Sequence, residues 1–415
     1  MRILFANNFL YERGGAEKSL FDTARLLEEN GHNIFFFSSK FKENVSYTYE
    51  KYFTSDIDYQ SHSIVDKLKS LSKIYYNLES NRKVNKLLKE IGDIDIAHMN
   101  NIMYRVGVSI VRTFKEKSIP VVYHLRDYNL MCGAINLTAN GEICEGCKDY
   151  NFSNVLKERC KGGFTGSLAI YTSMVFYHKI MDIFKDVDIF ISPSNFMKTK
   201  YHELGFNKNI EVLPNFINME DFEPCYKDDG SYVYFGRLAP EKGIYTLLNI
   251  CKRLPAHKFK IIGAGPLEEH CKSFITENNL TNVRFLGYMR GKRLYDEIKL
   301  SRASIVPSEW YENNSKSIME SMALGKPVIA SRIGGNPELV TERENGYLFE
   351  PFNEEDLVDK LMMAEKEREW EDMGKRGREI IERYYNPQIY YERLIGIYEK
   401  IAGGKQCHQI RPTFS

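Results

Sequence analysis

The sequence ASIVPSEWYENNSKSIMESMALGKPVIA, residues 303–330, reads as a strand, a loop, a helix and a second strand. The expected strands are residues 303–306 and 327–330. A strand, a crossover helix and a second strand form the parallel βαβ unit, and open α/β sheets bind ligands at the carboxyl ends of their strands. The stretch therefore predicts a parallel sheet with a binding site beside the loop and the helix start.

Two carboxylates in this unit, Glu312 and Glu320, stand eight residues apart. The spacing places Glu312 in the loop before the helix and Glu320 about one turn inside it, so that both face whatever docks at the helix N-terminus. Carboxylates only accept hydrogen bonds, whereas a helix N-terminus attracts anions. The pair therefore predicts a polyhydroxyl, anionic ligand such as a nucleotide sugar.

Apolar, strand-like runs alternate with helical periodicity through the rest of the chain. The first half has expected strands at residues 2–6, 33–38, 94–98, 120–124 and 188–192, and an expected helix at 15–29. The second half has expected strands at residues 232–235, 258–262, 283–286, 303–306 and 327–330. This alternation indicates repeated βαβ units, and hence an α/β protein with mainly parallel sheets.

The length of the chain indicates two domains, because 415 residues exceed what one core usually supports. Residues 207–230 lose periodicity and gather turn formers, as an interdomain connection does. We expect two Rossmann-like, doubly wound domains, at residues 1–208 and 209–387, that face each other across a cleft. The helical end of the chain, from about 388 to 415, is expected to pack back on the first domain.

The composition of the chain argues against nucleic acid as a partner and bears on where the protein is located. Lys and Arg total 57 against 56 Asp and Glu, a formal net charge of +1, whereas nucleic-acid binding usually needs a concentrated basic face. The N-terminus begins directly as a buried-looking strand without an apolar signal region. No stretch reaches the ~18 uncharged apolar residues that cross a bilayer. We therefore expect a cytoplasmic protein that does not bind nucleic acid.

A charged glycine loop follows the expected strand 232–235. It contains Gly236, Arg237, Lys242 and Gly243. The glycines permit close backbone approach, while Arg237 offers a fork of donors and Lys242 a compact charge, both suited to a diphosphate. A solvated loop with two unrelated cations is the alternative, but the position at the carboxyl end of a strand favours a ligand site.

Two further glycine segments are candidates for ligand contact, one at the end of an expected strand and one at the start of an expected helix. Gly263-Ala-Gly265 lacks the third glycine and the acidic ribose partner of a dinucleotide fingerprint, so a tight turn near a nucleotide is favoured over an NAD site. Arg13-Gly14-Gly15 opens the first long helix. Its backbone amides could bind a phosphate or an acceptor hydroxyl, and a plain turn that needs a positive φ is the equal alternative.

His98 and His124 each close an expected strand of the first domain. A strand-end imidazole is more often structural than catalytic, but both would lie at the cleft edge, and His124 is the stronger candidate. The pattern Asp-x-Asp at residues 56–58, 93–95 and 186–188 is interpreted as solvent-edge strand starts rather than as metal ligands.

Four of the eight cysteines cluster in sequence as Cys132, Cys144, Cys147 and Cys160. One Cys-x2-Cys pair with two flanking cysteines suggests a structural zinc site that stiffens a long loop. Buried free thiols are the equal alternative, whereas disulfides are disfavoured in the cytoplasm.

A basic amphipathic region runs from Lys67 to Lys89, with seven Lys and Arg residues interleaved with apolar ones. A surface helix with a solvated face is the favoured interpretation. Peripheral contact with an anionic membrane is the alternative, and it would bring a lipid-borne acceptor near the first domain.

Together these motifs make the chain resemble the retaining GT-B glycosyltransferases of glycosyltransferase family 4 (glycosyl transferases group 1). The resemblance runs over essentially the whole length and rests on Gly14-Gly-Ala-Glu17, Asp95-Ile-Ala-His98, His124, residues 236–243, Glu312-x7-Glu320 and residues 325–331. Two departures concern the donor sugar. The usual Glu-Gly-Phe-Gly is here Glu312-Asn-Asn-Ser315, and the usual His-Asp is spread out as His124-Leu-Arg-Asp127.

The resemblance implies roles for single residues. Arg237 and Lys242 would neutralise the departing diphosphate, and Glu320 would hold the ribose hydroxyls. Glu312 and His124 would contact the donor sugar. The remaining expected donor-binding residues are Gly15, Gly236, Gly265, the helix start Asn314, Ser315, Lys316 and Ser317, and, beside the base, Leu286, Tyr288 and Met289.

The resemblance also implies transfer of a sugar from a UDP- or GDP-sugar to a saccharide or lipid-linked saccharide, with retention, in surface polysaccharide biosynthesis. Cations and helix amides would stabilise the leaving diphosphate, so no divalent ion is required. No carboxylate pair is suited to glycoside hydrolysis. The alternatives are a nucleotide-sugar epimerase of the same fold and a non-catalytic nucleotide-sugar-binding scaffold.

Overall fold

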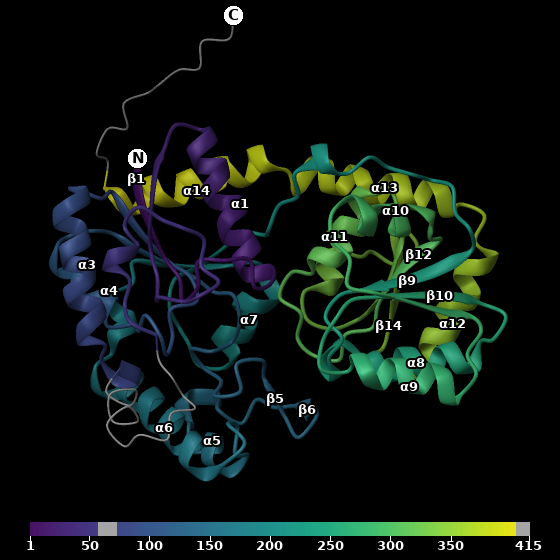
Figure 1. Cartoon of the computed structure of the whole chain (residues 1–415), viewed down its shortest axis with the longest axis horizontal. Helices are drawn as coiled ribbons and strands as arrows, with labels where there is room; N and C mark the ends of the chain where they lie inside the picture. Colours follow the sequence, from purple (N-terminus) through teal and green to yellow (C-terminus); the bar gives the residue numbers. More distant parts are fainter. Residues whose placement is uncertain (57–72, 404–415) are drawn as a thin grey trace, which may run out of the picture.

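The computed structural model describes residues 1–56 and 73–403 (Figure 1). In these residues the chain forms two six-stranded parallel sheets, one in each lobe. The first sheet has the order β2-β1-β3-β4-β7-β8 and the second β11-β10-β9-β12-β13-β14. In the first sheet β1 lies between β2 and β3, and in the second sheet β9 lies between β10 and β12, as in doubly wound folds. The predicted α/β architecture with two Rossmann-like lobes is therefore confirmed.

The first lobe alternates strands and helices. Its parallel strands are β1 (Arg2–Ala6), β2 (Asn33–Phe37), β3 (Ile96–Met99), β4 (Val121–His124), β7 (Ile189–Ser192) and β8 (Ile210–Val212). Its helices are α1 (Gly15–Glu29), α3 (Leu78–Ile91), α4 (Ile110–Glu116), α5 (Asn154–Lys157), α6 (Phe164–Val175) and α7 (Asn195–Glu203). A short hairpin pairs β5 (Thr138–Ala139) with β6 (Glu142–Ile143).

The second lobe repeats the pattern. Its strands are β9 (Ser231–Phe235), β10 (Lys258–Ile262), β11 (Val283–Gly287), β12 (Ala303–Val306), β13 (Val328–Ser331) and β14 (Gly346–Phe349). Its helices are α8 (Ile244–Arg253), α9 (Glu268–Glu277), α10 (Lys292–Leu300), α11 (Lys316–Ala323), α12 (Glu354–Lys366) and α13 (Trp370–Tyr384). The final helix, α14 (Pro387–Ala402), returns to the first lobe (Figure 1, yellow).

Both faces of each sheet are buried, because alternate side chains of a strand point to opposite faces. In β1, Ile3 and Phe5 pack in one cluster with residues of α1 and α14, while Leu4 packs in another with residues of α3 and α4. In β9, Tyr232 packs towards α8 and α12, and Val233 towards α11. These near-continuous apolar runs produced the sequence signal for buried parallel strands.

The helix α14 begins where Asn386 caps it, with its side chain accepting a hydrogen bond from the N–H of Ile389, and Pro387 occupies the first turn. Its Tyr398 hydroxyl lies 2.6 Å from Nδ1 of His98 in β3. The expected helix that crosses back to the first lobe is therefore confirmed. The N–H of Ile217 donates to the carbonyl of Tyr385 at 2.9 Å, so the two links between the lobes lie side by side.

Several expectations need correction. Residues 210–212 form β8, which pairs with β7, so the first sheet continues past residue 208 into the stretch expected to be a linker. The strand β14 was not among the expected strands. The end of the predicted helix at 404–415, together with Lys67 and Lys69, lies outside the described residues. None of the described helices combines the length and apolar character that a bilayer crossing needs.

Candidate functional site

A cavity of about 400 Å³ opens between the two lobes, at the carboxyl ends of the strands. Residues from both lobes line this donor cavity, as we call it. The first lobe contributes the start of α1, the loop after β4 and the link between the lobes. The second contributes the loops after β9 and β12 and the start of α11. The lining residues include Gly15, Ala16, Ser19, Arg126, Asn215, Gly236, Lys242, Trp310, Glu312, Asn313, Asn314, Ser315, Lys316, Ser317 and Glu320.

At the centre of the donor cavity, Lys242 Nζ lies 2.6 Å from Oε1 of Glu312. The hydroxyl of Ser308 donates to the same oxygen at 2.6 Å. Burial would raise the pKa of Glu312, but Lys242 and Ser308 more than offset it and hold this pKa below its usual value. Glu312 is therefore a carboxylate at neutral pH, although its residue is only 6% exposed.

Gly243 explains how these two loops come so close. It has φ +69°, in the left-handed region, and a Cβ at this position would collide with the carbonyl oxygen of Pro307. Glycine carries no Cβ and adopts positive φ without strain. The loop with Lys242 can thus lie directly against the loop with Glu312.

The start of α11 faces the same cavity. Ser315 caps the helix, with its hydroxyl accepting from the N–H of Ile318. The hydroxyls of Ser315 and Ser317 lie 3.0 Å apart. The first amides of a helix have no partner within the helix and attract anions, which suits this end of the cavity to phosphate groups.

Two ion pairs join α1 to α11 across the lobes. Lys18 Nζ lies 3.3 Å from Oε1 of Glu320, and Lys316 Nζ lies 2.9 Å from Oδ2 of Asp22. Burial lowers the pKa of Lys316, which Asp22 partly offsets. Glu320 therefore faces the first lobe and has a cation beside it. Lys18 was not among the predicted site residues, because on α1 it reads as an ordinary solvated lysine.

Arg126, also missed, is the cation that the first lobe contributes to the lining. Its Nη1 donates to Oδ1 of Asn215 at 3.0 Å and its Nε to Oδ1 of Asn100 at 3.3 Å. The amide of Asn313 donates to the Arg126 carbonyl at 2.8 Å, which ties the two lobes together. Burial lowers the pKa of Arg126, but its usual value is so high that the side chain stays charged. The sequence signal that could have identified Arg126 is a charged residue directly beyond the end of β4.

The structure does not bring His124 into the donor cavity, and its contact with a donor sugar stays a prediction. His98 and His124 are fully buried in the first sheet, with ring centroids 5.5 Å apart. Neither ring nitrogen of His124 has a hydrogen-bond partner among the described residues, and His124 does not line the donor cavity. Burial, followed by Arg126 and His98, lowers its pKa far below the usual value. His124 ends a strand inside the core, whereas Arg126 extends beyond it.

Of the other predicted residues, the structure brings Gly15, Gly236, Lys242, Glu312, Glu320 and the segment Asn314, Ser315, Lys316 and Ser317 into one cavity. It does not bring Arg237 there: this side chain is 66% exposed and lies 3.7 Å from Glu241. Gly265 forms a turn against the backbone of Leu238. Leu286 and Met289 are half-buried beside the core of the second lobe, and Tyr288 is 71% exposed. A role for these residues beside a base stays a prediction.

The four clustered cysteines are free thiols. Burial, with the neighbouring thiols, raises the pKa of Cys132 to about 11 and that of Cys147 to about 12. Cys147 is influenced by Cys132, Cys160 and Cys144, so the four thiols share one neighbourhood. Within residues 1–56 and 73–403, however, no three metal-binding side chains are arranged as a metal site. The structural zinc stays a prediction, which metal analysis of the purified protein would test.

Two family models match the chain. The model described as Glycosyltransferase Family 4 matches residues 13–221, and the one described as Glycosyl transferases group 1 matches residues 217–380. The first therefore covers the lobe with Gly15 and Arg126, and the second covers the lobe with Lys242, Glu312 and Glu320.

Known proteins resemble the chain to different extents. An uncharacterized 42.6 kDa protein in the cps region of Klebsiella pneumoniae is 24% identical over 382 residues, 86% of this chain and 92% of that protein. The uncharacterized glycosyltransferase MJ1178 of Methanocaldococcus jannaschii is 31% identical over 205 residues, which are 48% of this chain and 55% of that protein. The match with MJ1178 thus spans about half of either protein.

The structure of Anabaena Alr3699/HepE in complex with UDP shares the fold. Its TM-score is 0.67 at 17% identity, and the match covers 96% of this chain and 100% of that chain. At this identity the likeness concerns the fold, which is the expected GT-B arrangement of two Rossmann-like lobes around a cavity.

Proposed function

This chain belongs to glycosyltransferase family 4, and on that premise we propose that it transfers a sugar from a nucleoside diphosphate sugar to a saccharide or lipid-linked saccharide. The observation that carries the proposal is one cavity that holds Lys242, Glu312, Glu320 and the start of α11. A phosphate-binding helix end, a ribose-binding carboxylate and a cation for a leaving diphosphate are the parts that this reaction needs.

The charges in the cavity suit the transition state. As the bond between the anomeric carbon and the diphosphate oxygen breaks, negative charge grows on the diphosphate and positive charge on the sugar. Lys242 and the amides of α11 would stabilise the diphosphate. The carboxylate of Glu312 would face the sugar, and Glu320 would accept hydrogen bonds from the ribose. No divalent ion is required in this scheme.

We propose that transfer retains the anomeric configuration. The acceptor hydroxyl attacks from the face that the diphosphate leaves, and a new bond joins its oxygen to the anomeric carbon. The hydroxyl proton passes to an oxygen of the departing phosphate. Glu312 already pairs with Lys242 and Ser308, so it is poorly placed to act as a free base for water, which disfavours glycoside hydrolysis.

The nucleotide is proposed to be UDP or GDP, and the UDP in complex with Anabaena HepE supports a nucleoside diphosphate. The acceptor is proposed to belong to surface polysaccharide biosynthesis, which the cps region of the Klebsiella relative supports. We place the reaction in the cytoplasm, at the membrane surface. Arg82, Lys86 and Lys89 are exposed on α3 and could contact anionic lipid.

A thermal-shift screen with UDP, GDP and their sugars tests the donor, because a ligand that binds only the folded state raises the melting temperature. One of the two nucleotides should raise it selectively. NMR of the product then reports the anomer, and an inverted anomer would reject retention. Release of an epimerised donor without acceptor would support an epimerase instead, and binding without any turnover would support a scaffold.

A further inference from the structure

A second cavity, of about 460 Å³, lies in the first lobe beside the loop that follows β2. Its lining includes Lys40, Phe41, Lys42, Asn44, Glu50 and Lys51. Because the first sheet is parallel, the carboxyl ends of β1, β2 and β4 lie along one edge, so this basic cavity and the donor cavity share that edge. Three ammonium groups against one carboxylate give its lining an excess of positive charge.

Most of this positive charge is not neutralised. Among the residues that the structure describes, Lys40 and Lys42 have no ion-pair partner, and both are exposed. Lys51 lies 3.6 Å from Oε1 of Glu90, which neutralises it in part. Uncompensated cations that line a concave surface raise the local concentration of anions.

Phe41, which lines the basic cavity, packs with an aromatic group in the segment that precedes α1. Phe41 stacks on Tyr11, with ring centroids 5.8 Å apart and the rings 3° from parallel, and meets Phe9 edge-on at 5.0 Å. The guanidinium of Arg13 lies over the ring of Phe9 at 4.9 Å. Two residues later, Gly15 lines the donor cavity. The aromatic group and the donor cavity are therefore joined by a short stretch of chain at the start of α1.

The walls of the basic cavity are fixed by hydrogen bonds. Asn44 accepts from the N–H of Leu10 at 2.9 Å and donates to the carbonyl of Ser39 at 2.8 Å. The N–H of Lys40 donates to the carbonyl of Thr54 at 2.7 Å. These bonds hold the loop against β1 on one side and against residues 53–54 on the other.

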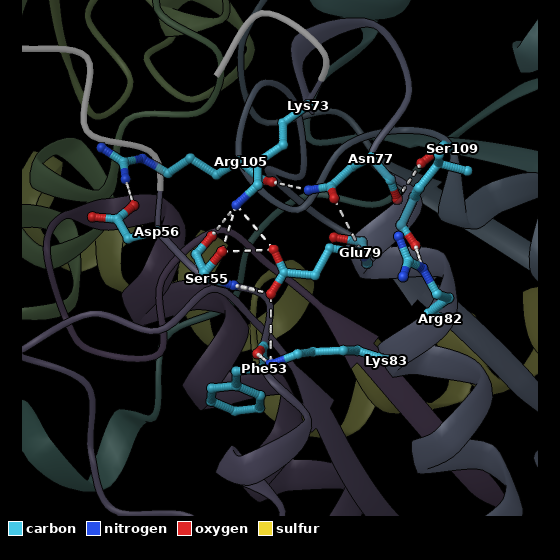
Figure 2. Close-up of polar contacts among 12 residues, drawn as sticks. Phe53, Ser55, Asp56, Lys73, Asn77, Glu79, Arg82, Lys83, Arg105 and Ser109 are labelled. Atoms are coloured by element: carbon cyan, nitrogen blue, oxygen red, sulfur yellow. Dashed lines mark hydrogen bonds and ion pairs between the residues drawn. The ribbon is translucent and has the colours of Figure 1, made fainter. Parts of the chain in front are cut away.

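Beyond residue 54 the chain is anchored to the start of α3 (Figure 2). Ser55 donates from its N–H and its hydroxyl to the two oxygens of Glu79, at 2.9 and 2.6 Å. Lys73 Nζ lies 3.0 Å from Glu79 and donates to the hydroxyl of Ser55. Lys83 donates to the carbonyl of Phe53, which also lines the basic cavity. These contacts anchor residues 53–55, to which the backbone of Lys40 is bonded through the Thr54 carbonyl.

We propose that the basic cavity binds a phosphate or diphosphate group of the acceptor. The inference rests on the proposed transferase function and adds the chemical class of its acceptor. Lys40 and Lys42 offer two ammonium groups without an ion-pair partner among the described residues, which suits a doubly charged phosphate ester better than a single carboxylate. Lysine binds phosphate as a point charge without a fixed direction, which suits a group at the end of a variable acceptor.

The site is tested with pyrophosphate as the ligand. The donor cavity is first saturated with UDP or GDP, whichever binds, so that pyrophosphate cannot bind there. We expect titration calorimetry of the full chain to show pyrophosphate binding that weakens at least tenfold in Lys40→Ala/Lys42→Ala. Nucleotide binding should stay unchanged in that variant. Lys117→Ala/Lys252→Ala removes two exposed lysines elsewhere that form no ion pair with the described residues, and it should bind pyrophosphate like the wild type. Equal loss in both variants, or no binding at nucleotide saturation, would overturn the proposal.

A competition experiment identifies the source of the phosphate, and the nucleotide titration shows whether a negative result concerns this site or the proposed function. Farnesyl diphosphate in detergent micelles that competes more strongly than pyrophosphate would indicate a lipid-linked phosphate, and equal competition a soluble one. If neither nucleotide binds the wild type, the transferase proposal fails. Pyrophosphate binding that is lost in Lys40→Ala/Lys42→Ala alone would still locate an anion at this cavity, so the two failures are distinguishable.

Discussion

The ammonium of Lys242 lies 2.6 Å from a carboxylate oxygen of Glu312, although 70 positions separate the two residues in the chain. Each comes from a loop at the carboxyl end of a different strand of the second sheet. The contact neutralises both charges and holds both side chains in place. Such preorganisation makes the pair costly to disturb.

Replacement of Glu312 by Gln is expected to lower kcat for transfer about 10²–10³-fold, the usual cost of losing one preorganised electrostatic partner. The variant keeps its shape but leaves Lys242 without its counter-charge. Steady-state kinetics at saturating donor measures the effect. Glu309→Gln, in the same loop but outside the cavity lining, should stay within about twofold of the wild type. Full activity in Glu312→Gln would remove Glu312 from the mechanism.

Glu320→Gln is expected to weaken nucleotide binding about tenfold, because hydrogen bonds to a charged acceptor exceed those to a neutral one by about 1.4 kcal/mol. Titration calorimetry with the nucleoside diphosphate measures the change. The exposed Glu355 provides the matched control, since Glu355→Gln should bind the nucleotide like the wild type. Unchanged affinity in Glu320→Gln would place the ribose elsewhere.

Arg126→Lys and Arg126→Met separate charge from shape. Arginine donates in two directions, to Asn215 and to Asn100, and lysine cannot reproduce this fork. We expect kcat/KM to fall about tenfold in Arg126→Lys and further in Arg126→Met. Two quantities are compared between each variant and the wild type: the melting temperature without nucleotide, and the rise in melting temperature that nucleotide causes. If Arg126 acts on the ligand, the second should change more than the first. A larger change in the melting temperature without nucleotide would show that Arg126 is purely structural.

Asp127 should make the protein less stable as the pH rises through the weakly acidic range. Burial raises its pKa from 3.8 to about 6, partly offset by the N–H of Asn129. The folded state thus binds a proton that the unfolded state has lost between these values, so stability decreases from pH 4 to 6. Asp127→Asn keeps the acceptor for Asn129 and should raise the melting temperature at pH 7.5 by about 2 °C.

Well below pH 3.8 the advantage of Asp127→Asn should vanish, because the wild-type side chain is then neutral in both states. Asp359→Asn, at an exposed carboxylate, should show no such pH-dependent difference. An advantage that persists unchanged at low pH would mean that ionisation of Asp127 is not its cause.

Chelation is expected to leave transfer intact. Lys242 and Arg126, with the amides at the start of α11, offer positive charge to the diphosphate, and the carboxylates Glu312 and Glu320 already pair with lysines. Activity after EDTA treatment, compared with activity after added Mg²⁺, measures this. A loss on chelation that Mg²⁺ restores would show that a divalent ion takes part.

Much of the fold could be predicted because buried parallel strands form continuous apolar runs between amphipathic helices. The predicted bounds of β1, α1, β10 and β12 match those observed. The strand β8 has only three residues, Ile210–Val212, in a stretch rich in turn formers, so local sequence did not distinguish it from a linker. Pairing with β7 defines it, and pairing between distant segments leaves no local signal.

For a similar reason, the residues of the donor cavity from the second lobe were predicted better than those from the first lobe. Residues in the strand-loop-helix units of the second lobe, such as Lys242 and Glu320, were found because loop position and residue type together are informative. Arg126, Lys18 and Asn215 line or flank the cavity only through the approach of the first lobe, which the sequence does not encode locally. His124 does not line the cavity, because the end of β4 lies inside the core.

The hydrogen bond between Ile217 and Tyr385 fastens the two passages of the chain from lobe to lobe. A polypeptide that crosses a gap twice at one place can pivot there, but the halves cannot slide apart. Asn215 stands at this pivot and also touches Arg126 in the donor cavity. The place where the two passages of the chain meet is therefore in direct contact with the lining of the donor cavity.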